Sequence, residues 1–134
     1  MIRQTISHEY AEMNRQLHNE KPEYGAAAEN DAPAVAKYAR KVGAKTLLDF
    51  GCGKGTLKPA LMQIAPEISV FEYDPAVPGK EALPAHAVDV VAAMDVMEHI
   101  EPDYLTAVLQ TMISLQPKIV IMKISLTPAK KNVA

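Results

Sequence analysis

The chain has 134 residues, of which 49% are hydrophobic and 22% charged, as in an ordinary folded globular domain. Its 14 basic and 16 acidic side chains leave a formal charge of -2, so no broad positive field is available to hold nucleic acid. No apolar run approaches the ~20 residues of a membrane helix, the polar N-terminus does not resemble a secretory signal, and the single cysteine excludes an internal disulfide. We expect one cytoplasmic domain, residues 1–134, with neither a membrane nor a nucleic acid as partner.

Residues 1–28 are expected to form an N-terminal helix and a loop. Apolar side chains recur at helical spacing within residues 5–20, at Ile6, Tyr10, Met13 and Leu17. This helix would either cover a binding site or pack as a plain surface helix.

Residues 29–127 alternate between helical and extended patterns. Helices are predicted from an N-cap at Asp31 to Gly43, over Thr56–Ala65, and from Glu101 onward. Strands are predicted at Thr46–Phe50, Ile68–Tyr73, Val88–Met94 and in the KIVIMKI run after Pro117, with a loop over residues 75–87. The pattern indicates an α/β fold, an open and mainly parallel sheet of about four strands with helices on both faces. Such sheets bind ligands at the carboxyl ends of their strands.

A glycine-rich turn follows the first predicted strand, in the segment LLDFGCGKGTL. Gly51, Gly53 and Gly55 would let the backbone approach a ligand closely, and the next helix would present its first amides there. The spacing matches neither the dinucleotide fingerprint nor the phosphate loop. Cys52, which has no evident base near it in the sequence, is interpreted as a small apolar filler rather than a nucleophile.

Asp49 stands two residues before the first glycine. A carboxylate there would repel a pyrophosphate and favour a ligand that carries an ammonium and a sulfonium group, as S-adenosylmethionine does. A ribose over this turn calls for an acid ~20 residues further on, at the end of the second strand. Asp74 has that place, and Glu72, on the same strand face, is its rival.

Three segments resemble the first, second and fourth motifs of class I S-adenosylmethionine-dependent methyltransferases: LLDFGCGKGTL, FEYDPAVPG and VDVVAAMDVMEHIEPDYL. The resemblance spans about residues 45–124 and implies a Rossmann-like sheet that binds S-adenosylmethionine. It places five residues around the methionine and ribose parts of the cofactor: Asp49, Gly51, Cys52, Gly53 and Gly55. It also implies Asp74 on the ribose and Asp95 near the methyl-transfer centre. The family's third strand has hardly any room here, and its usual last two strands are lacking.

Glu98 and His99 follow the fourth motif's strand and have two interpretations. His99 would act as a general base or acid, oriented by Glu98, or both would cap and solvate the next helix. The order Asp95, Glu98, His99 also resembles the metal-binding segment of Hen1-type small-RNA 2′-O-methyltransferases, but no histidine follows His99, so no metal is expected.

The sequence thus predicts methyl transfer from S-adenosylmethionine, with a small molecule as acceptor and His99, Asp95 and Glu98 as candidate catalytic residues. One alternative is a non-catalytic or truncated cofactor-binding module that self-associates or joins a partner chain through an exposed sheet edge. The other alternative is the metal-dependent RNA 2′-O-methyltransferase.

Overall fold

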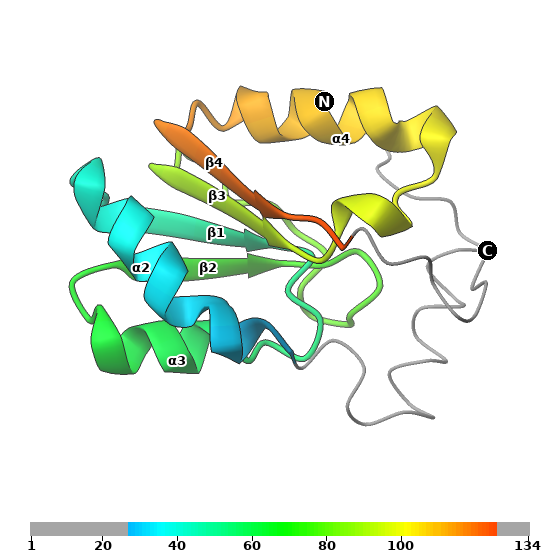
Figure 1. Ribbon diagram of the computed structural model, residues 1–134. Coiled ribbons are helices and arrows are strands. Elements are labelled where there is room, and N and C mark those ends of the chain that lie inside the picture. The colour runs from blue at the N-terminus through cyan, green and yellow to red at the C-terminus, as the bar shows by residue number, and fades with distance from the viewer. Residues whose placement is uncertain (1–26, 126–134) are drawn as a thin grey trace.

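The computed structural model describes residues 27–125 (Figure 1). Three short 3-10 helices are η1 (Ala27–Asp31), η2 (Met97–His99) and η3 (Pro102–Tyr104). The α-helices are α2 (Ala32–Lys41), α3 (Leu57–Ile64) and α4 (Leu105–Ser114). The strands are β1 (Thr46–Phe50), β2 (Ser69–Tyr73), β3 (Val90–Met94) and β4 (Ile119–Lys123). The helix expected within residues 5–20 lies outside the described residues.

The four strands form one parallel sheet in the order β2-β1-β3-β4. From β1 the chain first builds outward to β2 and then returns to the opposite side of β1 to form β3. The strand order therefore reverses beside β1, and its carboxyl end is the place where open α/β sheets bind their ligands. The predicted fold, a Rossmann-like parallel sheet within an α/β domain, is confirmed.

Helices cover both faces of the sheet, with α2 and α3 on one side and α4 on the other (Figure 1). Successive residues of β1 point to opposite faces, so Leu47 packs in the α2 and α3 core and Leu48 in the α4 core. Both leucines are fully buried. This two-sided burial explains why the strands are continuous apolar runs in the sequence.

The amino end of β3 differs from the prediction by two residues, since the strand begins at Val90 rather than Val88. Asp89 explains the difference, because its Oδ2 accepts hydrogen bonds from the backbone amides of Lys45 (2.7 Å) and Thr46 (3.2 Å). In return, the amide of Asp89 donates to the hydroxyl of Thr46 (2.9 Å). Side-chain contacts therefore replace the ladder toward β1, while on the β4 side Asp89 O still accepts a hydrogen bond from the amide of Lys118 (2.8 Å).

Two helix starts also differ from the sequence pattern. Asp31 occupies the N-cap position of α2, but its side chain makes no capping hydrogen bond. The helix expected from Glu101 begins as the 3-10 turn η3, and α4 follows from Leu105.

The sheet has two edge strands, β2 and β4. Residues 74–87, which follow β2, form no strand; the amide of Asp74 donates to Lys80 O (2.8 Å), and the Phe71 ring lies against that of His86. Within residues 27–125, the outer edge of β4 pairs with no strand. Val120, Met122 and Ile124 at this edge remain 38%, 39% and 47% exposed.

Candidate functional site

The glycine loop, residues 51–55, leaves the carboxyl end of β1 at the reversal of strand order. The amides of Gly51 and Cys52 both donate to Tyr73 O, at 2.7 and 3.1 Å, and the amide of Gly55 donates to Cys52 O at 2.9 Å. The first two bonds tie the loop to the end of β2. The loop is therefore a fixed backbone surface directly before α3.

A side chain on Gly51 or on Gly55 would crowd a neighbouring side chain. Both have positive φ angles, +79° and +74°. A Cβ on Gly51 would lie 2.5 Å from Cγ2 of Val96, and a Cβ on Gly55 would lie 2.5 Å from Glu72 Oε2 and 2.6 Å from Lys80 Nζ. The loop is thus packed between the segment after β3 and the end of β2.

Asp49 is buried beneath this loop and is only 2% exposed. Its Oδ2 has no hydrogen-bond partner among the described residues. Burial, the largest cause, and the negative charges of Glu72 and Asp74 together raise its pKa to about 7, while the positive charge of Lys80 opposes them. A nearby positive charge stabilises the ionised form of such a buried carboxyl, and a positively charged ligand would supply that charge.

Asp74 and Glu72, the two candidate ribose acids, both border the loop. Asp74 Oδ2 accepts a hydrogen bond from the amide of Gly53 (2.9 Å), and its Oδ1 accepts one from the amide of Ala76 (2.9 Å). Each oxygen keeps a second lone pair, so Asp74 could still accept hydrogen bonds from hydroxyl groups. Glu72 instead forms an ion pair with Lys80, with Nζ 3.3 Å from Oε1.

Cys52 is buried in the same loop. Burial raises the pKa of its thiol to about 12, and the neighbouring charge of Asp49 contributes. The thiol is therefore protonated at neutral pH and unsuited to nucleophilic attack. This agrees with its interpretation as a small filler.

The three candidate catalytic residues follow β3 and are only partly brought together. Asp95 has a left-handed backbone, with φ of 57°, and its side chain is 33% exposed. Glu98 is exposed, and its Oε2 accepts a hydrogen bond from the amide of Ser125 (3.1 Å). Within the described part of the chain, no hydrogen bond holds the His99 imidazole. The structure thus gives Glu98 a partner other than His99, and the catalytic roles stay predictions.

Lys80, Val96 and Lys123 also belong to this end of the sheet, although the sequence motifs did not identify them. Lys80 pairs with Glu72 and lies near Gly55, and Val96 packs on Gly51, as described above. Lys123 ends β4, and its Nζ lies 3.5 Å from Asp95 Oδ2 and 3.2 Å from Asp31 Oδ1. A charged residue at the carboxyl end of the apolar run KIVIMKI was the one sequence signal for it.

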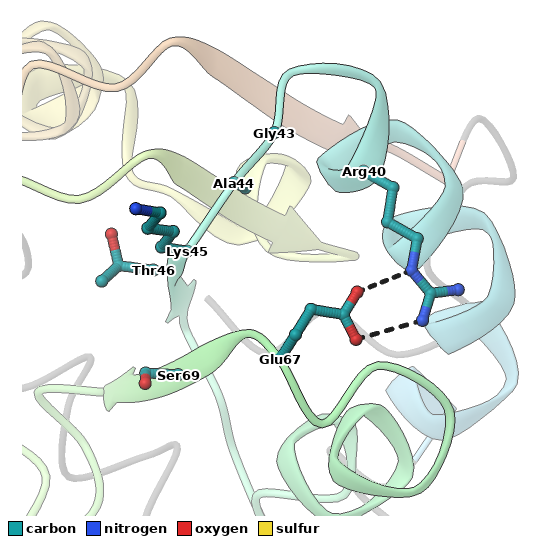
Figure 2. A pocket seen from close by; sticks show the side chains of 7 residues that line it. All are labelled: Arg40, Gly43, Ala44, Lys45, Thr46, Glu67 and Ser69. Atoms are coloured by element: carbon teal, nitrogen blue, oxygen red, sulfur yellow. Dashed lines mark hydrogen bonds and ion pairs between the residues drawn. The ribbon is translucent and has the colours of Figure 1, made fainter.

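A pocket lies at the opposite end of the sheet, away from the glycine loop (Figure 2). Thr46 and Ser69, at the amino ends of β1 and β2, form part of its lining. The Arg40 guanidinium bonds the Glu67 carboxylate beside it, with Nε 2.8 Å from Oε2. None of the residues predicted to bind a ligand lines this pocket.

Residues 27–125 contain neither a candidate metal-binding cluster nor a candidate membrane span. No group of three or more histidine, cysteine, aspartate or glutamate side chains there is arranged to hold a metal ion. No helix in this range is long and apolar enough to cross a membrane.

Comparison with known proteins gives one match. A sequence model described as a methyltransferase domain matches residues 11–127. Neither the search of curated proteins nor that of solved structures returns a significant match. The family match covers most of the chain and includes the glycine loop, Asp74 and the segment after β3. The chain therefore belongs to the methyltransferase domain family.

Proposed function

We propose that the protein binds S-adenosylmethionine and transfers its methyl group to a small molecule. The observation that carries this proposal is Asp49, a buried carboxyl at the base of the glycine loop whose Oδ2 has no hydrogen-bond partner within residues 27–125. A ligand with an ammonium or sulfonium group would offset the cost of ionising this carboxyl.

The residues present fit the cofactor. Asp49 would face its positive groups, the backbone of residues 51–55 would accommodate its close approach, and Asp74 would accept hydrogen bonds from the ribose hydroxyls. When bound, S-adenosylmethionine supplies an electrophilic methyl group on a positively charged sulfur.

The charge of the site also argues against phosphorylated ligands. The glycine loop is bordered by three acids, Asp49, Glu72 and Asp74, against two lysines: Lys80, which is paired with Glu72, and Lys54 within the loop. A pyrophosphate placed here would meet more negative than positive charge. This supports an adenosyl ligand without phosphates over NAD or ATP.

Catalysis would be mostly positional, with the protein aligning the acceptor and the methyl group. Asp95 or His99 would take up the acceptor's proton where the acceptor must lose one. Asp95 directly precedes Val96, which packs on Gly51, and the amide of His99 donates to Val96 O (3.0 Å). Glu98, bonded to Ser125, would assist by holding this segment.

Isothermal titration calorimetry tests the cofactor assignment directly. S-adenosylhomocysteine and S-adenosylmethionine should bind the full chain, whereas NAD and ATP should give no heat of binding at the same concentrations. Thermal melting should show a midpoint that rises with adenosyl ligand concentration. Binding of NAD in preference to both adenosyl ligands would refute the proposal.

Asp74→Ala should weaken S-adenosylhomocysteine binding by about 1–3 kcal/mol, because a charged acceptor of hydrogen bonds is lost. Glu72→Gln is the matched comparison, since Glu72 is already neutralised by Lys80. It should change the affinity less than Asp74→Ala does. If Glu72→Gln has the larger effect in calorimetry, Glu72 is the ribose acid instead.

The exposed edge of β4 favours a second candidate function. In it, the chain is a non-catalytic domain that keeps the cofactor-binding fold and assembles with another chain. Val120, Met122 and Ile124 offer apolar contacts there, and the backbone offers strand pairing. For this candidate, saturating S-adenosylmethionine should leave the melting midpoint unchanged. Analytical ultracentrifugation should then show assembly that depends on these three side chains.

A further inference from the structure

We infer that Lys123 is a positioning residue of the proposed methyl-transfer centre, because its ammonium holds Asp95 beside the glycine loop through an ion pair shared with Asp31. This inference rests on the proposed function. It assigns a role to a side chain that lies outside the three family motifs.

The backbone brings Lys123 and Asp95 together. Lys123 is the last residue of β4 and is in register with Met94, the last residue of β3. The ladder continues one step further, because the amide of Asp95 donates to Lys123 O at 2.7 Å. Immediately there, Asp95 adopts its left-handed conformation, which aspartate tolerates better than most residues. Non-glycine residues held in such conformations are concentrated at functional sites.

The side chains add a second connection. Lys123 Nζ lies 3.2 and 3.5 Å from the two carboxylate oxygens of Asp31, and 3.5 Å from Asp95 Oδ2. Asp31 is 15% exposed and uses its carboxylate for this contact instead of capping α2. The hydrogen bond and charge of Asp31, followed by the charge of Asp95, raise the pKa of the Lys123 ammonium. It therefore remains charged throughout the physiological pH range.

Asp95 in turn adjoins the loop that would bind the cofactor. Val96, the next residue, packs so closely on Gly51 that no Cβ would fit between them. A change in the direction of Asp95 would therefore be transmitted to this contact. Without the ammonium of Lys123, the carboxylates of Asp31 and Asp95 would both lose the positive charge that they share, and the repulsion between them would act on Asp95.

An exposed ion pair can also be merely structural, with a contribution of about 0–1 kcal/mol to stability. A second lysine near β4 offers a matched control for a purely structural ion pair. Lys118, just before β4, lies 3.9 Å from Asp89 Oδ1 at the amino end of the sheet, and its side chain is 54% exposed, against 49% for Lys123. A purely structural role predicts similar behaviour of the two lysines.

The test is calorimetric titration of S-adenosylhomocysteine into the full chain and its variants. Lys123→Met should weaken binding at least about fivefold, while Lys118→Met should leave it unchanged and lower the melting midpoint by a similar amount. Lys123→Arg, which keeps the charge, should restore binding to within about twofold. In an Asp95→Asn background, Lys123→Met should cause no additional loss, as expected when one residue acts through the other.

The outcomes separate the two ideas. If the wild-type chain binds S-adenosylhomocysteine and Lys123→Met binds it equally well, the inference is wrong and the proposed function stands. The inference is also wrong if Lys118→Met weakens S-adenosylhomocysteine binding as much as Lys123→Met does. It is equally wrong if Lys123→Met weakens binding as much in the Asp95→Asn background as in the wild-type chain. If the wild-type chain does not bind S-adenosylhomocysteine, the proposed function and the inference fall together.

Discussion

Asp49→Asn should make the protein more stable at pH 8 and at the same time a poorer cofactor binder. The pKa of Asp49 is raised from 3.8 to about 7 in the folded chain, chiefly by burial. That displacement corresponds to at most ~4 kcal/mol of ionisation cost at high pH. A buried asparagine amide needs hydrogen-bond acceptors of its own, so we expect a net gain of about 1–3 kcal/mol.

The stability gained in Asp49→Asn should depend on pH, because the folded and unfolded chains release the Asp49 proton at different pH values. Below pH 3.8 the carboxyl is protonated in both the folded and the unfolded chain, so its ionisation costs nothing. Between pH 3.8 and about 7 the folded chain keeps a proton that the unfolded chain releases, so wild-type stability falls as the pH rises. Above about pH 7 Asp49 is ionised in the folded chain as well, so the whole free-energy cost of its ionisation lowers wild-type stability. Urea unfolding should therefore show the gain of Asp49→Asn at pH 8 and little of it at pH 4.

Asp89→Asn is the matched control at the other end of the sheet. The pKa of Asp89 is lowered, first by its hydrogen bond from the amide of Lys45, so removing its charge should destabilise the chain at pH 8. S-adenosylhomocysteine binding should fall at least about tenfold in Asp49→Asn, through the loss of a buried charge, and stay at the wild-type level in Asp89→Asn. A loss of stability at pH 8 in Asp49→Asn would contradict the account of this carboxyl.

Gly51→Ala should destabilise the chain by about 2–5 kcal/mol and abolish cofactor binding. The left-handed backbone at φ +79° costs a non-glycine residue about 1–2 kcal/mol. Crowding of the new Cβ against Val96, 2.5 Å away, adds about 1–3 kcal/mol. Urea unfolding would measure the loss of stability and calorimetry the loss of binding.

Gly43→Ala separates these two costs. Gly43 has a φ of +63°, and a Cβ there would meet nothing within 4 Å, so only the backbone cost of about 1–2 kcal/mol applies. Trimming Val96 to alanine in the Gly51→Ala chain should recover part of the difference. Equal losses in Gly43→Ala and Gly51→Ala would show that Val96 does not pack on the loop.

Most of the fold could be predicted because its determinants are local. A parallel sheet buried on both faces requires short continuous apolar runs, and β1 occupies the predicted residues Thr46–Phe50. The predictions failed where a distant side chain decides. Asp89 ends the β3 ladder by binding amides beside β1, and Asp31 reaches Lys123 at the far end of the described chain instead of capping its own helix.

The residues of the candidate site also fall into two groups, those indicated by a short local segment and those placed by contacts between distant segments. The glycines and Asp49 were recognisable because backbone approach and charge at a strand end are properties of one short segment. The positions of Lys80, Val96 and Lys123 depend on how separate segments meet in space. No spacing rule within the sequence indicates that Val96 would lie on Gly51, or that one ammonium would join two carboxylates.

The two edge strands of the sheet bear on how these molecules could aggregate. Within residues 27–125, neither β2 nor β4 pairs with a further strand on its outer side. Growth of a fibre needs two adhesive edges on every molecule, one to receive a neighbour and one to present to the next. A sheet with two unpaired edge strands, as described for residues 27–125, meets this requirement, so stacking through the strands would not by itself end at a pair.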